Sequence, residues 1–328
     1  MATNLWLWVG FIAIVLAMLA LDLGVFHRKA HEVRPKEAAV WVAVWVALAL
    51  LFAAGLWRFE GGHAALTFLT GYVIEEALSV DNLFVIAVIF NYFAVPAMCQ
   101  HRVLFYGILG ALIMRGVFIG LGSVLLARFE WILYVFGAVL LITGVRMMFK
   151  HDEEFVGEQN RVVRLVRRFV RLTPKYHSTN FFVVADGRRL ATPLFLVLIL
   201  VEFTDLVFAV DSIPAIFGIT RDPFLVFTSN IFAVLGLRSM YFLVASVIER
   251  YYLLKYGLAV ILSFIGVKML VEHWVHIEIM ASLSVVLATL TVSVAASLIW
   301  PEREKGPDFA RQEGRTGSIF GMLRRRKR

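Results

Sequence analysis

Long apolar runs separated by short polar segments occupy most of the chain. Nine runs can be marked, and each approaches or exceeds the roughly 20 residues that cross a bilayer as a helix. They lie at about 5–26, 37–57, 64–90, 101–126, 131–149, 192–217, 222–247, 251–271 and 277–300. The runs are continuous rather than alternating, so the pattern favours membrane helices over an outer-membrane barrel. The first run has no basic segment before it and is interpreted as a span, not as a cleaved signal.

The composition agrees with this pattern. Hydrophobic residues make up 60% of the 328 residues and charged residues only 17%, which excludes a soluble globular enzyme and a disordered chain. The single cysteine, Cys99, cannot form an intramolecular disulfide, a redox pair or a thiolate zinc site. We therefore expect an all-α polytopic membrane protein with about nine transmembrane helices.

The basic residues predict the orientation of these spans. With nine spans, 26 of the 32 Lys and Arg fall on the side that holds 27–36, the long loop at 146–189 and the tail after 300. Such a bias marks the cytoplasmic side, so the N-terminus is predicted outside and the C-terminus in the cytoplasm. The same bias accounts for the net charge of +8, and binding to nucleic acid is not expected.

The long loop has two features of its own. Arg161, Arg164, Arg168 and Arg171 recur every three or four residues, as on one face of a helix. A basic amphipathic helix on anionic lipids is the favoured interpretation, and a helix that binds a protein partner is the alternative. Further along, residues 181–190 resemble a β-hairpin that turns at 186–187.

An internal duplication gives the chain its organisation. The stretch VIEEALSVDN at 73–82 is similar to VEFTDLVFAVDSIP at 201–214, which aligns Glu75 with Asp205. Arg115 then falls near Arg238, and the GVR at 144–146 matches the GVK at 266–268. Each copy has three helices, so the second copy enters the membrane from the opposite face. This inverted 3+3 repeat is the architecture of many secondary transporters.

The domain boundaries follow from this duplication. The chain divides into two peripheral helices at 1–63, the first repeat at 64–149, a cytoplasmic basic loop at 150–191, the second repeat at 192–271, a ninth helix at 272–300 and a basic cytoplasmic tail at 301–328.

Both repeats carry acids within an apolar span. Each ionised carboxylate at the centre of a membrane helix costs about 2.5–3.5 kcal/mol, so the three acids of the third span cost about 8–10 kcal/mol. These acids must therefore line a polar path inside the protein. The two arginines within spans, Arg115 and Arg238, are too few to neutralise them, so protons or cations must supply the balance.

The side chains available for a cation are all oxygen ligands. We predict that Arg115 and Arg238 balance charge and that the metal ligands are Glu75, Asp81, Asn82, Glu202, Asp205, Asp211 and Ser212. A helix break at Pro214 would ease their convergence by freeing the Val210 carbonyl. Oxygen ligands suit Mg²⁺, Ca²⁺ or Mn²⁺, and the residues alone do not choose among these or exclude Na⁺ and protons.

The repeated motifs identify a family resemblance. EEALSVDNLFV at 75–85, ATPLFLVLILVEFTDLVFAVDSIPAIF at 191–217 and LGLRSMYFL at 235–243 resemble the TerC family of integral membrane proteins, in particular its Alx-type members. The resemblance covers about residues 5–300. It implies that Glu75, Asp81, Glu202, Asp205 and Asp211 form the acidic cluster of the family. The family has been tied to tellurium resistance, membrane redox modulation and manganese export, and Glu76 departs from its usual pattern.

These observations favour a transporter of the bacterial inner membrane that exports a divalent metal, with Mn²⁺ as the expected ion and protons as a candidate coupling ion. No enzymatic activity or cofactor is expected, and the oligomeric state is left open. The alternative is a redox or metal-stress modulator without transport, although one cysteine and no dinucleotide fingerprint speak against direct redox chemistry. Export of an organic cation is a third possibility, for which six carboxylates are excessive.

Overall fold

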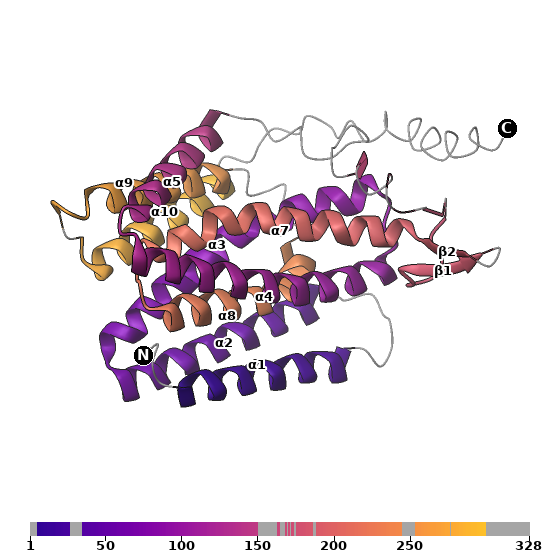
Figure 1. Cartoon of the computed structure of the whole chain (residues 1–328), viewed down its shortest axis with the longest axis horizontal. Coiled ribbons are helices and arrows are strands. Elements are labelled where there is room, and N and C mark those ends of the chain that lie inside the picture. The colour runs from indigo at the N-terminus through magenta and orange to yellow at the C-terminus, as the bar shows by residue number, and fades with distance from the viewer. Residues whose placement is uncertain are drawn as a thin grey trace.

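A computed structural model describes residues 5–26, 35–149, 163–164, 168, 170, 172–173, 175–185, 188–244, 253–275 and 277–299. In this part of the chain, helices form one elongated bundle with a small β-hairpin at one end (Figure 1). The helices are α1 (Leu5–Phe26), α2 (Pro35–Glu60), α3 (Gly62–Tyr92), α4 (Ala97–Arg128), α5 (Ile132–Phe149), α7 (Pro193–Phe217), α8 (Pro223–Val244), α9 (Leu254–Val271) and α10 (Ile279–Ile299). The strands are β1 (Phe182–Ala185) and β2 (Arg188–Ala191).

The helices have the length and composition of membrane spans. Seven of those described are long and apolar enough to cross a bilayer, and the chain is a polytopic helical membrane protein. α1 and α3 are outside this set. The apolar stretch found in α1, Leu5–Met18, is shorter, and α3 has three acids along its 31 residues. α3 packs against α2, α7 and α8, so it is shielded from lipid and can carry these acids.

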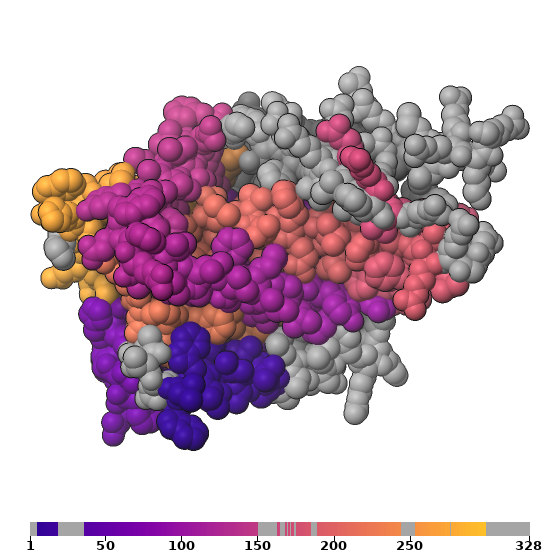
Figure 2. Space-filling model, in the orientation of Figure 1, coloured from indigo at the N-terminus to yellow at the C-terminus, as the bar shows by residue number. Residues whose placement is uncertain are grey.

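Large apolar side chains cover the outside of the bundle. Leu51 of α2, Ile113 of α4 and Val292 of α10 are each more than 60% exposed. In water such a surface would be an extensive apolar patch, whereas in a bilayer it faces hydrocarbon. Figure 2 shows one face of the molecule, on which α4 and α7 lie side by side.

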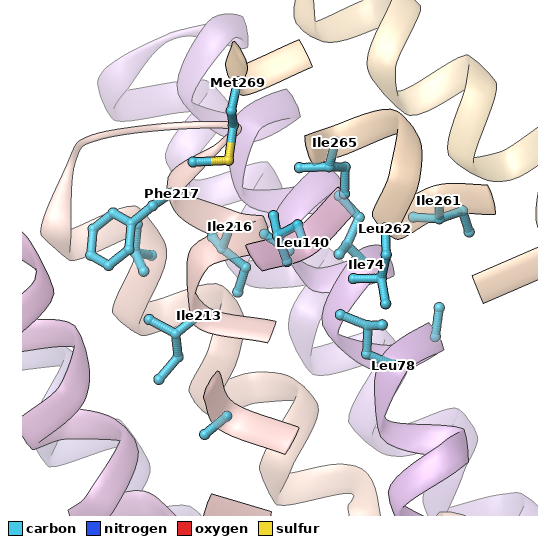
Figure 3. Close-up of a cluster of buried hydrophobic side chains, with 14 of the residues drawn as sticks. Ile74, Leu78, Leu140, Ile213, Ile216, Phe217, Ile261, Leu262, Ile265 and Met269 are labelled. Atoms are coloured by element: carbon cyan, nitrogen blue, oxygen red, sulfur yellow. The ribbon is translucent and has the colours of Figure 1, made fainter. Parts of the chain in front are cut away.

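The helices of the two predicted repeats pack against each other. Apolar side chains from α3, α5, α7 and α9 meet in one buried cluster, in which Leu140 of α5 lies near Ile216 of α7 and Leu262 of α9 (Figure 3). Glycines bring α5 and α9 into backbone contact, because a Cβ atom added at Gly266 would lie 2.7 Å from the Gly137 carbonyl oxygen.

This close approach gives a test of the fold. A Cβ atom at Gly144 would lie 2.7 Å from the Ala259 carbonyl oxygen, and neither backbone can move without separating α5 from α9. We expect Gly144→Val to destabilise the protein by about 1–3 kcal/mol, the usual cost of overpacking. Thermal unfolding in detergent measures this loss. Gly120→Val in α4 is the matched control, since nothing lies within 4 Å of a Cβ atom there, and equal melting temperatures for the two variants would contradict the prediction.

The segment before α7 packs on the end of the bundle where α3 joins α4. β1 and β2 pair antiparallel, with Phe182 opposite Ala191. Tyr176 donates a hydrogen bond to the carbonyl of Phe93 (2.7 Å), and Arg102 donates one to Thr179 (2.9 Å). The predicted turn at 186–187, most of the predicted basic helix at 161–172 and the tail at 301–328 lie outside the described residues.

One local prediction is wrong. α7 continues through Pro214 to Phe217, so it does not provide the expected break. Pro214 lies in the last turn of α7, where its missing N–H removes one hydrogen bond close to a helix end that is already stabilised by buried packing.

Candidate metal-ion site in the bundle core

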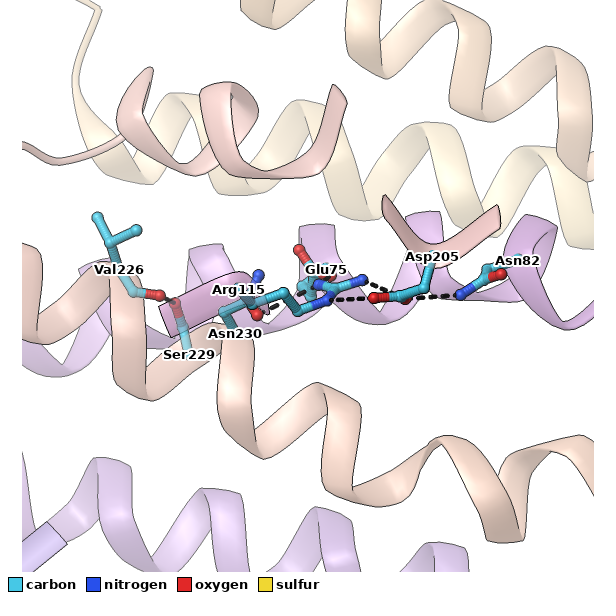
Figure 4. Close-up of polar contacts among 7 residues, drawn as sticks. All are labelled: Glu75, Asn82, Arg115, Asp205, Val226, Ser229 and Asn230. Atoms are coloured by element: carbon cyan, nitrogen blue, oxygen red, sulfur yellow. Dashed lines mark hydrogen bonds and ion pairs between the residues drawn. The ribbon is translucent and has the colours of Figure 1, made fainter. Parts of the chain in front are cut away.

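Arg115 of α4 lies at the centre of the buried polar residues. Its Nη1 pairs with Glu75 of α3, its Nη2 donates to Asp205 Oδ1 of α7 (3.0 Å), and its Nε donates to Asp205 Oδ2 (3.3 Å). All three side chains are buried, and Figure 4 shows the guanidinium group between the two carboxylates. One acid therefore comes from each of the two helices that the duplication relates.

Two amides complete this cluster. Asn82 of α3 donates from Nδ2 to Asp205 Oδ1 (2.9 Å), and Asn230 of α8 accepts from Arg115 Nη1 (3.2 Å). Asn230 was not among the predicted residues. Its signal in the sequence is an amide within an apolar run, which predicts a buried partner because an amide in lipid is costly. We refer to Glu75, Asn82, Arg115, Asp205 and Asn230 as the Arg115 cluster.

The Arg115 cluster does not balance its charge when its carboxylates are ionised. One guanidinium faces two carboxylates, so one negative charge is in excess. Glu75 Oε2 and Asn82 Oδ1 are buried oxygens with no hydrogen-bond partner among the described residues. Buried acceptors of this kind are normally satisfied, and an additional cation or proton would satisfy them here.

The other predicted residues are distributed around this cluster. Glu202 packs its carboxylate against Gly110 of α4, where any larger residue would displace it. Asp211 accepts a hydrogen bond from Thr143 of α5 (3.1 Å). The remaining three lie as follows: Asp81 is half-buried on α3, Arg238 is buried on α8, and Ser212 is buried with no partner for its hydroxyl among the described residues.

The predicted convergence of seven ligands on one ion is not present in this conformation. Within the described part of the chain, no three His, Cys, Asp or Glu side chains are grouped so that they could hold a metal ion. The physical reason is visible at Glu75 and Asp205, since the Arg115 guanidinium occupies the space between their carboxylates. A metal ion at this point would have to replace it.

A small cavity adjoins the cluster. It has a volume of about 20 Å³, which is room for one water molecule or a dehydrated ion. Asn82 and Asp205 line it together with apolar residues of α3, α4, α7 and α8, among them Gly107 and Ala111. These residues lie on the side of Asp205 that faces the α3–α4 connection.

Comparisons with known proteins agree with the motifs. The model of the integral membrane protein TerC family matches residues 60–305. An uncharacterized membrane protein of Myxococcus xanthus is 54% identical over 293 residues, which are 89% of this chain and 92% of that protein. A protein of Escherichia coli K12, named as a candidate membrane-bound redox modulator, Alx, is 52% identical over 88% of this chain and 92% of its own length. No solved structure matches the chain.

Proposed function

Because the chain belongs to the TerC family of integral membrane proteins, we propose that it exports a divalent metal cation, with Mn²⁺ as the expected ion, across the bacterial inner membrane. The resemblance predicted from its motifs is thereby confirmed, and the activity is our proposal. The observation that carries it is the pair of buried carboxylates, Glu75 and Asp205, that meet at Arg115 from helices α3 and α7. Buried acids within a membrane bundle are typical of ion paths.

The packing of the helices supports an inverted repeat. If α3, α4 and α5 correspond to α7, α8 and α9, a two-fold axis requires every contact between the copies to have a counterpart. α3 packs on α8 and α4 packs on α7, as this symmetry requires. Aligning Gly144 with Gly266 also aligns Gly137 with Ala259. The contact of Gly266 with the Gly137 carbonyl then has its counterpart in the contact of Gly144 with the Ala259 carbonyl.

In this proposal, Arg115 takes the place of the cation when the transporter is empty. Two acids without a counter-charge would be costly to carry across the bilayer interior, and the guanidinium removes most of that cost. An incoming metal ion would displace Arg115 from Asp205 and gain the carboxylate and amide oxygens as ligands.

Protons are the proposed coupling ion. We further propose nine spans, an outside N-terminus, a cytoplasmic C-terminus and anionic lipid at the basic loop.

Metal accumulation in cells tests this function. Cells that lack their own exporter and express Glu75→Gln or Asp205→Asn should retain more Mn²⁺ than cells with the unsubstituted protein, because each variant loses an anionic ligand. Intracellular manganese measured by mass spectrometry, at matched protein levels, gives the result. Unchanged export in both variants would eliminate these residues as ligands.

The competing function is redox or metal-stress modulation without transport, which the name of the E. coli relative suggests. It would depend on Cys99, the single thiol of the chain, which is buried and donates from Sγ to the Ser178 carbonyl (3.3 Å). Cys99→Ser therefore separates the two functions. Loss of function in Cys99→Ser, together with tolerance of amides at the acids, would favour modulation, whereas the proposed exporter keeps its activity without the thiol.

A further inference from the structure

The two halves of the bundle differ at one pair of corresponding positions. Aligning α4 with α8 through Arg115 and Arg238 places Gly107 opposite Asn230 and Ala111 opposite Val234. We call the end of the bundle near the α3–α4 connection the inner end, and the end near the α4–α5 connection the outer end. Gly107 lies on the inner side of the Arg115 cluster and Asn230 on its outer side.

The inner side contains the cavity. Gly107 has no side chain, and the space beside it is lined by Asn82 and Asp205 and by apolar neighbours such as Ile86 and Ala111. Two polar groups of the Arg115 cluster therefore have a packing gap on their inner side. A side chain at position 107 would enter this region, because a Cβ atom there would already lie 3.2 Å from Val201 Cγ1.

The outer side is filled at the corresponding point. The Asn230 side chain is fully buried and reaches Arg115 Nη1 (3.2 Å). Next to it, Ser229 and Ile216 pack against Gly71. A Cβ atom added at Gly71 would lie 2.8 Å from Ser229 Oγ and 3.4 Å from Ile216 Cγ2. Asn230 Nδ2 is a buried donor with no partner among the described residues, so this nitrogen does not hold the side chain in place. The position of the Asn230 side chain is therefore explained by its packing and by its contact with Arg115.

We propose that Asn230 is the residue that closes the outer half of the ion path, by filling the space that Gly107 leaves open in the inner half and by holding Arg115. The inference rests on the proposed repeat and path. It assigns this structure to a state that is accessible from the inner end and sealed at the outer end. Asn230 acts through Arg115 and through packing, so it is a positioning residue.

Reporter cysteines on the two sides of the Arg115 cluster test the proposal without any measurement of transport. In a Cys99→Ser background, Ala111→Cys lies on the inner cavity and Ser229→Cys lies on the filled outer side, against Gly71. The probe is 2-aminoethyl methanethiosulfonate, added to membrane vesicles on one side with free cysteine as scavenger on the other. We expect Ala111→Cys to react from the inner side, and Ser229→Cys to react from the outer side at least about tenfold more slowly, as for a minor conformation.

Asn230→Gly should then raise the outer reaction rate of Ser229→Cys by about tenfold, because it opens the sealed half. Thr228→Ala, at another buried polar residue of α8, is the matched control and should leave that rate unchanged. Asn230→Ala replaces Asn230→Gly if the glycine variant does not fold. Gly107→Asn should slow the reaction of Ala111→Cys with the probe, because the new side chain fills the cavity. It is combined with Val201→Ala to make room for the added Cβ atom.

Equal outer reactivity of Ser229→Cys before and after the change at Asn230 would overturn the proposal, as would equal reactivity of the two reporters without any change at Asn230. Because no metal is involved, this outcome is distinct from a failure of metal export. The expected changes in labelling, together with no Mn²⁺ export by the unsubstituted protein, would instead retain the sealed half and reject the metal as substrate.

Discussion

Arg115→Gln should lose net metal export while it retains exchange of metal for metal. Without the guanidinium, Glu75 and Asp205 have no counter-charge in the Arg115 cluster when no metal is bound, so the empty transporter cannot return across the bilayer. The loaded form keeps its ligands and can still exchange. Proteoliposomes loaded with Mn²⁺ and diluted into buffer with or without external Mn²⁺ measure the two modes separately.

The same variant should be less stable in the absence of metal. Breaking a buried ion pair by removing one partner costs about 3–5 kcal/mol, because the remaining charge stays buried. We expect Mn²⁺ to raise the melting temperature of Arg115→Gln more than that of the unsubstituted protein, since the ion would replace the missing positive charge. Arg115→Lys keeps the charge and is the control. Net export by Arg115→Gln at the normal rate would rule out the counter-ion role of Arg115.

Asp205→Asn should reduce metal export at least about tenfold, because it removes the carboxylate with the most hydrogen bonds in the Arg115 cluster. Asp205 accepts from Arg115 Nε, Arg115 Nη2 and Asn82 Nδ2, and an amide cannot accept all three bonds. The Arg115–Glu75 pair remains and is neutral, so this variant should lose less stability than Arg115→Gln. Efflux of Mn²⁺ from proteoliposomes and thermal unfolding give the two values.

Glu76→Gln is the matched control for Asp205→Asn. Glu76 is also an acid within a span, but its hydrogen-bond partner is Tyr72 and it lies outside the Arg115 cluster. Combining Asp205→Asn with Arg115→Gln should give a non-additive change in unfolding free energy, of about 0.5–3 kcal/mol, as contacting residues do. Additive changes in unfolding free energy would contradict the coupling of Asp205 with Arg115. An equal loss of export in Glu76→Gln would contradict the assignment of Asp205 as a metal ligand.

The sequence determined the properties that depend on composition and on the length and spacing of the apolar runs. Apolar runs of about 20 residues must form helices in lipid, because only a helix satisfies its own backbone there. The acids within these runs must face protein, and Glu75 and Asp205 are therefore among the seven ligands that the sequence predicts. The motifs also led to the family, since the stretch at 191–217 is long and specific.

The tertiary structure decided which of these residues meet. Arg115, Glu75 and Asp205 are far apart in the chain, and their contact depends on how α4 packs against α7 and α8, which both pack against α3. Helix periodicity gives the direction of a side chain around one helix but not the rotation of its neighbour, so the sequence could not show which of the predicted residues contact Arg115. Asn230 was missed for the same reason, because its role comes from a contact across α8 and α4 and not from its own sequence neighbours.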